Sequence, residues 1–192
     1  MKRIIFLISV LGIVLAGFCK SNDAEAEQAG QHIVIKSNTP APDFVLFDAE
    51  DKAFRLSDNL DKTVVLCFLR EMPDKKTGKY WLNISQKWMR HLQEKYGNKI
   101  VIIGLKEMTN IPVFIPKSLI KSRLKKQSFR FLIDWDGIVF DQYPSKELFT
   151  LYVASPERNI VYTVSDPYSD SLFVKLCEKN RELFKKGEKD EK

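Results

Sequence analysis

"APDFVLFDAEDKAFRLSDNLDKTVVLCF", residues 41–68, is the stretch that decides the fold. It begins with two short extended segments, 44–47 and 53–56, and the polar residues 48–52 between them predict the turn of a β-hairpin. An almost continuous apolar run, 64–69, comes next, and such a run is typical of a strand that is covered on both faces. The stretch therefore predicts a sheet that starts with a hairpin and continues into a buried strand.

The residues after this strand predict a helix, a second buried strand and a short helix. In 79–96 the apolar residues recur at helical spacing: Trp81, Ile84, Trp88 and Leu92. Gly97 is a natural C-terminal stop for this helix. "KIVIIGL", residues 99–105, is a second apolar strand, and 117–127 is a short helix that follows two prolines.

The C-terminal half predicts two strand pairs and a closing helix. "FRFLIDWDGIVFDQ", residues 129–142, is expected to form two strands around a turn at Asp136-Gly137. Segments 148–154 and 159–164 predict the second pair. Residues 169–185 predict one amphipathic helix, with an inward face of Leu172, Phe173, Leu176 and Leu183. The whole order predicts an α/β protein with one central mixed sheet flanked by helices.

Two aspartates in the expected turn are candidates for acid–base chemistry. Asp134 and Asp136 flank Trp135, and paired carboxylates can act as a general acid and a general base. However, D-x-D-G between two strands is also ordinary turn chemistry. We expect a structural role for both carboxylates.

The N-terminus predicts an exported protein. Lys2 and Arg3 precede an uncharged apolar run, 4–18, which is the pattern of a secretory signal peptide. This run is shorter than the roughly 20 residues that span a bilayer as a helix. The expected organisation is as follows: a signal peptide at 1–18, a polar tether at 19–38, a globular domain at 39–186 and a charged tail at 187–192. The expected location is the periplasm or cell envelope.

Two processing sites compete at the end of the apolar run. "LAGFC" ends in Cys19 and resembles the lipobox of bacterial lipoproteins, in which the cysteine becomes the lipidated first residue. Phe18 departs from that pattern, because the residue before the cysteine is normally small. Alternatively, Ala24-Glu25-Ala26 is an A-x-A cleavage signal that would release an unlipidated chain. We favour a lipoprotein that is anchored to the membrane through Cys19.

The charge of the chain argues against nucleic acid as a partner. The sequence has 31 basic and 25 acidic residues, and without Lys2 and Arg3 the net charge falls from +6 to +4. The distribution is uneven, since 111–133 contains six basic residues and no acidic one: Lys117, Lys121, Arg123, Lys125, Lys126 and Arg130. This set predicts a patch for anionic lipid headgroups, envelope glycans or an acidic protein, although a solvated helix face would look the same.

Several segments together resemble the redoxin branch of the thioredoxin superfamily, which holds the AhpC/TSA and TlpA-like proteins. The matching pieces are "APDFVLFDAEDKAFRLSDNLDKTVVLCF", "LQEKYGNKIVIIGL", "FLIDWDG" and "LFTLYVASPERNIVY", in the family's order. The resemblance covers roughly residues 40–185. It implies a thioredoxin-like three-layer sandwich with an N-terminal β-hairpin.

Two hallmarks of that family are missing from this sequence. The family carries C-x-x-C at the end of the strand that matches 64–69, and at the usual spacing the pair would fall on Pro73 and Lys76. Alternatively, "REMP" at 70–73 matches the run after the pair, and the cysteine segment is deleted. The family also places a cis-proline where Phe149 stands, and a cis bond before a non-proline residue costs roughly 2.5–4 kcal/mol, so we expect a trans bond.

The remaining cysteines are expected to be structural. Cys67 lies inside the expected strand 64–69 and Cys177 in the closing helix, and we expect both to be buried, with or without a disulfide between them. Copper-assembly proteins share this fold, but Met72, His32 and His91 lack paired metal-ligand spacing. The sequence predicts no catalytic residue, cofactor or metal site, and it gives no indication of oligomeric state.

The sequence leaves two functions open. The favoured one is an exported, lipid-anchored thioredoxin-like domain that binds or scaffolds partners in the cell envelope without dithiol chemistry. The alternative is a thiol–disulfide oxidoreductase or peroxiredoxin-like protein that uses Cys67 or Cys177 in an atypical way.

Overall fold

The computed structural model describes residues 39–185, apart from Leu60, Pro73 and Asn110. The expected signal peptide, the tether with Cys19 and His32, and the charged tail lie outside the described residues. Among the helices that are described, none is long and apolar enough to cross a membrane.

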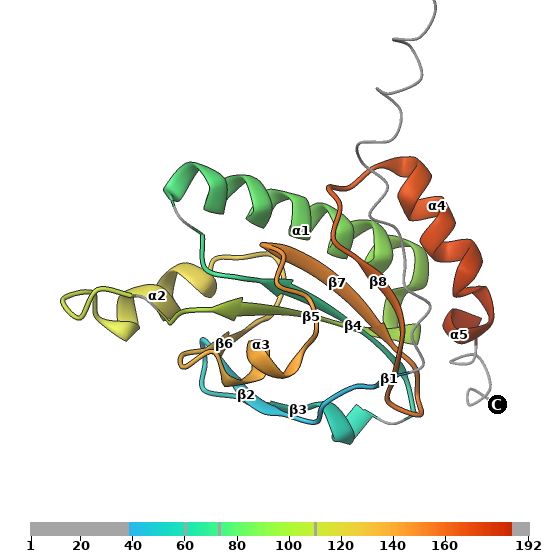
Figure 1. Cartoon of the computed structure of the whole chain (residues 1–192), viewed down its shortest axis with the longest axis horizontal. Helices are drawn as coiled ribbons and strands as arrows, with labels where there is room; N and C mark the ends of the chain where they lie inside the picture. Colours follow the sequence, from blue (N-terminus) through green and yellow to red (C-terminus); the bar gives the residue numbers. More distant parts are fainter. Residues whose placement is uncertain (1–38, 60, 73, 110, 186–192) are drawn as a thin grey trace, which may run out of the picture. The chain divides into compact units, whose positions relative to one another are not determined.

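The described strands form one mixed sheet, in the order β1-β8-β7-β4-β5-β6-β2-β3 (Figure 1). They are β1 (Thr39–Pro40), β2 (Val45–Asp48), β3 (Ala53–Arg55), β4 (Thr63–Leu69), β5 (Ile100–Glu107), β6 (Phe131–Asp134), β7 (Phe149–Ala154) and β8 (Asn159–Val164). Central strand β4 pairs in parallel with β5 and antiparallel with β7, and β5 pairs in parallel with β6. The predicted mixed sheet and its N-terminal hairpin, β2 with β3, are confirmed.

Helices cover both faces of this sheet. They are α1 (Lys75–Tyr96), α2 (Lys117–Leu124), α3 (Ile138–Gln142), α4 (Asp170–Lys179) and α5 (Arg181–Lys185). In Figure 1 α1 and α4 lie on one side of the sheet and α3 on the other. All seven residues of β4 are buried, and its side chains alternate between two apolar clusters, one with Trp88 of α1 and one with Phe140 of α3. The predicted three-layer α/β sandwich is confirmed.

Helix α1 begins at Lys75, four residues before the predicted start. The Asp74 carboxylate accepts hydrogen bonds from the backbone N–H groups of Lys76 (2.8 Å) and Thr77 (3.0 Å), which caps the first turn. The first turn carries no apolar stripe, so hydrophobic periodicity did not reveal it. Gly97 ends the helix, as predicted. Its φ of 54° suits glycine, because a residue with a side chain would be strained in this conformation.

The prediction of a second strand after the turn at Asp136-Gly137 is wrong, because residues 138–142 form α3. Gly137 has φ of 76° and turns the chain out of the sheet. The buried Asp134 carboxylate then accepts hydrogen bonds from the backbone N–H groups of Gly137 (3.1 Å) and Phe140 (3.0 Å). These contacts favour a helical turn over a strand, although "IVF" has high β-propensity.

The predicted closing helix is split in two at Asn180. The Asn180 side-chain amide donates to the Leu176 carbonyl at 2.8 Å, and the backbone N–H of Asn180 shares the same acceptor at 3.1 Å. An amide that competes for a backbone carbonyl interrupts regular helix, so α4 ends at Lys179 and α5 begins at Arg181. Both helices still contribute to the core, since Leu176 and Phe184 are buried.

Candidate functional site at the junction of β4 and α1

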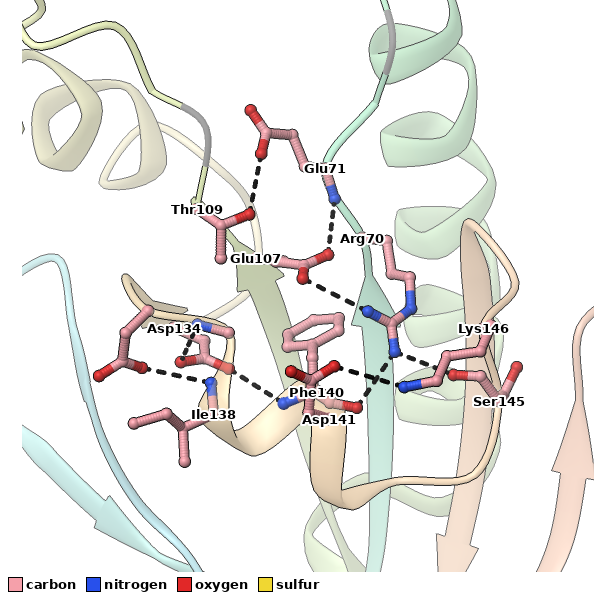
Figure 2. A network of polar contacts seen from close by, with 12 residues as sticks. Arg70, Glu71, Glu107, Thr109, Asp134, Ile138, Phe140, Asp141, Ser145 and Lys146 are labelled. Atoms are coloured by element: carbon pink, nitrogen blue, oxygen red, sulfur yellow. Dashed lines mark hydrogen bonds and ion pairs between the residues drawn. The ribbon is translucent and has the colours of Figure 1, made fainter.

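The carboxyl ends of β4, β5 and β6 meet at one edge of the sheet, where the chain passes from β4 into α1 (Figure 1). Ligand and reaction sites of open α/β sheets gather at this edge, because loops from several strands converge there. Arg70 and Glu71 follow β4 directly, and Glu107 is the last residue of the neighbouring strand β5. These three residues form the centre of the polar network in Figure 2. We call this region the junction.

Arg70 connects three segments at the junction (Figure 2). Its guanidinium forms a salt bridge with Glu107 at 3.3 Å, and the two side chains are only 14% and 12% exposed. The same guanidinium donates to the carbonyl oxygens of Phe140 and Ser145, both at 3.1 Å, and lies 5.4 Å from the centre of the Phe140 ring. Arg70 therefore holds α3 and the loop before β7 against the end of β4.

Further polar contacts fix the backbone of the junction. The second carboxylate oxygen of Glu107 accepts from the backbone N–H of Glu71 at 3.1 Å, and the Thr109 hydroxyl donates to the Glu71 carboxylate at 3.1 Å. The Lys106 ammonium donates to the Arg70 carbonyl at 2.8 Å. Burial lowers the pKa of Lys106 to about 8, although the nearby Glu71 and Glu107 carboxylates act to raise it. The described part of the junction is thus organised by charged side chains.

Neither cysteine of the described region is at the junction. Cys67 lies within β4 with no exposed surface, and burial raises the pKa of its thiol well above the usual range. Cys177 lies on α4 and is 5% exposed. Both are free thiols, so no disulfide joins them, and their predicted burial is confirmed. The family's cysteine pair would fall on Pro73 and Lys76. Lys76 is an exposed residue of α1, and Pro73 lies outside the described residues.

An aromatic pair occupies the position of the family's cis-proline. Phe149 begins β7 opposite Leu69 of β4 and is fully buried. Its ring stacks on Trp81 of α1, with ring centroids 5.7 Å apart and planes inclined by 14°. The described residues contain no cis peptide bond, so the predicted trans bond at Phe149 is confirmed. The first residue of β7 therefore packs a large ring against the N-terminal part of α1.

The two aspartates of the DWDG segment accept hydrogen bonds from backbone N–H groups at the start of α3. Besides the two hydrogen bonds that the Asp134 carboxylate accepts, the Asp136 carboxylate accepts one from the backbone N–H of Ile138 at 3.3 Å. Burial raises the pKa of Asp134 to about 6, and the neighbouring Asp136 carboxylate adds to this rise. The pKa of Asp136 is lowered, mainly by its hydrogen bond with Asp134. The expected structural role of these carboxylates agrees with the geometry.

His91 packs against aromatic side chains of another segment. Its ring lies 4.6 Å from the Tyr168 ring and 5.8 Å from the Phe173 ring, and its Nδ1 is 2.8 Å from the Lys87 carbonyl. Met72 also contacts the apolar cluster on the α1 side of the sheet. These contacts give both residues packing roles.

The structure divides the predicted basic patch into two groups. Lys121 pairs with Asp51 and Arg130 pairs with Asp48 at 2.8 Å, so both cations are bound to the β2–β3 hairpin. The other four are exposed: Lys117, Arg123, Lys125 and Lys126. The Lys117 ammonium lies 4.6 Å from the centre of the Trp135 ring. Lys125 and Lys117 also act on carboxylates, because they contribute to lowering the pKa of Glu50 and of Asp136 respectively.

An apolar groove lies between the junction and α2. It has a volume of about 240 Å³, and its apolar lining consists of Met108, Ile111, Pro112, Ile115, Ile120 and Leu124. Glu71 of the junction and Arg123 of α2 add the charged groups. Sequence reasoning missed both this groove and the Arg70–Glu107 pair. One signal was available for the pair, because the ends of adjacent parallel strands must lie close together.

Comparison with solved structures shows a thioredoxin-like fold. The exposed lipoprotein thioredoxin of Streptococcus pneumoniae is 18% identical, over 72% of this chain and 99% of that one, with a TM-score of 0.55. Peroxidoxin BcpB of Mycobacterium tuberculosis is 20% identical, over 78% and 98%, with a TM-score of 0.53. A thiol:disulfide interchange protein of the thioredoxin family from Chlorobium tepidum is 14% identical, over 77% and 97%, with a TM-score of 0.54.

These neighbours include both kinds of protein in the redoxin branch that the sequence resembles, an oxidoreductase and a peroxidoxin. No family model matches the sequence, and no curated protein matches it at a significant level. The fold is therefore shared with these proteins.

Proposed function

We propose that the protein is an exported thioredoxin-like module that binds or scaffolds partners in the bacterial cell envelope and carries no dithiol redox chemistry. The observation that carries this proposal is the composition of the junction of β4 and α1, which is organised by polar side chains and not by thiols. Arg70, Glu107 and the Asp74 cap organise this part of the fold, and both thiols of the described region are buried elsewhere.

Thiol–disulfide exchange and peroxide reduction both require an accessible thiolate. The Cys67 thiol has no exposed surface, and burial raises its pKa, so the thiolate is disfavoured at neutral pH. Cys177 lies on α4 and is 5% exposed, so it is buried as well.

The proposal places the mature protein at a membrane through a lipid on Cys19. Its support is the lipobox-like "LAGFC" after the apolar run 4–18. One structural neighbour of this fold is itself an exposed lipoprotein. Mass spectrometry of the mature N-terminus tests this part, because a diacylated Cys19 and an unmodified chain that starts at Glu27 differ in mass and sequence.

The redox part is tested by thiol labelling of the native protein together with insulin-reduction and peroxide-consumption assays. We expect slow labelling of Cys67 and Cys177, rapid labelling after unfolding in urea, and no turnover in either assay. A thioredoxin serves as the positive control. Rapid native labelling with a turnover that Cys67→Ser or Cys177→Ser abolishes would establish the oxidoreductase alternative instead.

A further inference from the structure

A tight turn before α2 presents two adjacent apolar side chains to solvent. The backbone N–H of Ile115 donates to the Pro112 carbonyl at 2.8 Å, which closes the turn. At its tip Val113 is fully exposed and Phe114 is 84% exposed. In Figure 1 this loop and α2 extend beyond the edge of the sheet, away from α4 and α5. Two large apolar residues at a protruding tip are costly in water and point to a binding role.

Exposed cations follow this tip in the chain, and no acidic residue occurs from 111 to 133. Lys117 is the first residue of α2, three positions after Phe114. Arg123, Lys125 and Lys126 follow at and beyond the end of the same helix, and all are exposed. Lys121 of α2 pairs with Asp51, and Arg130 before β6 pairs with Asp48, so these two basic residues are bound to the β2–β3 hairpin.

We propose that this surface, Val113 and Phe114 with the cations Lys117, Arg123, Lys125 and Lys126, docks the domain onto an anionic lipid bilayer. The two apolar side chains enter the boundary between headgroups and acyl chains, and the cations bind lipid phosphates. This inference rests on the proposed location in the cell envelope and names the partner of the predicted basic patch.

The shape of the surface favours a bilayer over the other anionic partners. Val113 and Phe114 stand on a convex tip, and a bilayer accepts protruding apolar side chains without a matching pocket. Glycan sites instead need a concave set of polar groups around the ligand. If Cys19 is lipidated, residues 19–38 reach no more than about 70 Å even when fully extended, so the domain stays close to the bilayer. Weak docking then becomes effective, because the local lipid concentration is high.

The first experiment compares vesicles of different charge. The protein, purified from the membranes of cells that export it, is mixed with vesicles of phosphatidylcholine alone or with about one third phosphatidylglycerol. The measured quantity is the ratio of the partition coefficients for anionic and neutral vesicles. An N-terminal lipid anchor would bind neutral and anionic vesicles alike, so its contribution cancels in the ratio. The ratio therefore reports on the proposed docking surface. We expect a clear preference for anionic vesicles, which high salt removes.

The variant Arg123→Glu/Lys125→Glu/Lys126→Glu should lower this ratio on the order of 100-fold, at about fivefold per cation removed. The matched control reverses three exposed cations on the opposite side of the domain: Lys175, Lys179 and Arg181. The control makes the same change in net charge and should lower the ratio much less. Thermal unfolding of both variants checks that they remain folded.

Insertion of the tip is measured with Phe114→Trp. The new indole is exposed, so we expect its emission to shift to shorter wavelength with anionic vesicles, while Val174→Trp on α4 shows no shift. Phe114→Ser should weaken anionic binding by about tenfold or more.

Equal partitioning of the native protein into both vesicle types overturns the inference and leaves the proposed envelope location intact. An equal loss in the two charge-reversed variants also overturns it, since net charge would then explain binding. Loss of an acidic protein partner in the α2 variant, without any vesicle preference, would assign the surface to that protein instead.

Discussion

Phe149 stacks on Trp81 at the start of α1, with ring centroids 5.7 Å apart and planes inclined by 14°. The pair connects the first residue of β7 to the first turns of α1. In the redoxin family the same two elements bring a cis-proline next to reactive thiols. Here they bring two aromatic rings together, which is a packing interaction and not a reactive one.

Replacing the buried ring is expected to destabilise the protein strongly. Phe149→Ala leaves a cavity beside Trp81 and should lower the free energy of unfolding by about 3–5 kcal/mol, measured in urea. Tyr80→Ala is the matched control, because Tyr80 contacts the same Trp81 ring at 5.2 Å but is 50% exposed. A similar loss in both variants would contradict the assignment of Phe149 as the core partner of Trp81.

The Arg70–Glu107 pair should contribute to stability through its burial. Arg70→Met leaves the Glu107 carboxylate without its ion-pair partner, and we expect a loss of about 3 kcal/mol in the free energy of unfolding. Glu107→Met should cost a similar amount. The double variant should lose less than the sum of the two, with a coupling of at least about 1 kcal/mol.

A second ion pair nearby provides the control for this cycle. Lys146 and Asp141 are also 3.3 Å apart, but their side chains are 67% and 74% exposed. Lys146→Met should therefore change stability by less than about 1 kcal/mol. Additive losses at Arg70 and Glu107 would show that the two side chains act independently.

The sheet was predictable because its strands have strong local signals. All seven residues of β4 are apolar or small, so the sequence pattern alone indicates burial on both faces. The stop at Gly97 was equally clear, since a positive φ suits glycine. These features depend on residues that are close together in the chain.

The errors occur where distant or specific polar contacts decide the structure. Residues 138–142 have the composition of a strand, but hydrogen bonds to the Asp134 carboxylate turn them into α3. The contact between Arg70 and the Ser145 carbonyl joins residues 75 positions apart, and no local pattern reveals it. The absence of cysteines between β4 and α1 could therefore be predicted from the sequence. The polar side chains that organise the junction could not.

Close packing between two strands makes Gly104 sensitive to substitution. Gly104 of β5 pairs with Phe131 of β6, and a Cβ at this position would overlap the Phe131 ring, which is 2% exposed. Gly104→Ala should cost about 1–3 kcal/mol in the free energy of unfolding. Adding Phe131→Leu should make room for the new methyl group, so the double variant should be less destabilised than the sum of the single ones. Additive losses would contradict this steric explanation.

Asp134 should make stability depend on pH in the acidic range. Burial raises its pKa from 3.8 to about 6 in the folded protein, so the folded state binds more protons than the unfolded state between these values. Stability contributed by the protonated carboxyl should therefore fall as pH rises from about 4 to 6, by about 1–3 kcal/mol. Asp136 has a lowered pKa, so its contribution is lost only below about pH 4.

The test measures urea unfolding of the native protein and of Asp134→Asn at about pH 4.5, 5.5 and 7. The asparagine does not titrate, so the variant should lack most of the decrease that the native protein shows across this range. The quantity compared is the change in stability with pH, not the absolute stability of the variant. The substitution itself destabilises the variant, because the backbone N–H of Gly137 or of Phe140 loses its carboxylate acceptor. Asp141→Asn, which changes an exposed carboxylate on α3, should keep the decrease. The same pH dependence in Asp134→Asn and the native protein would mean that another group is responsible.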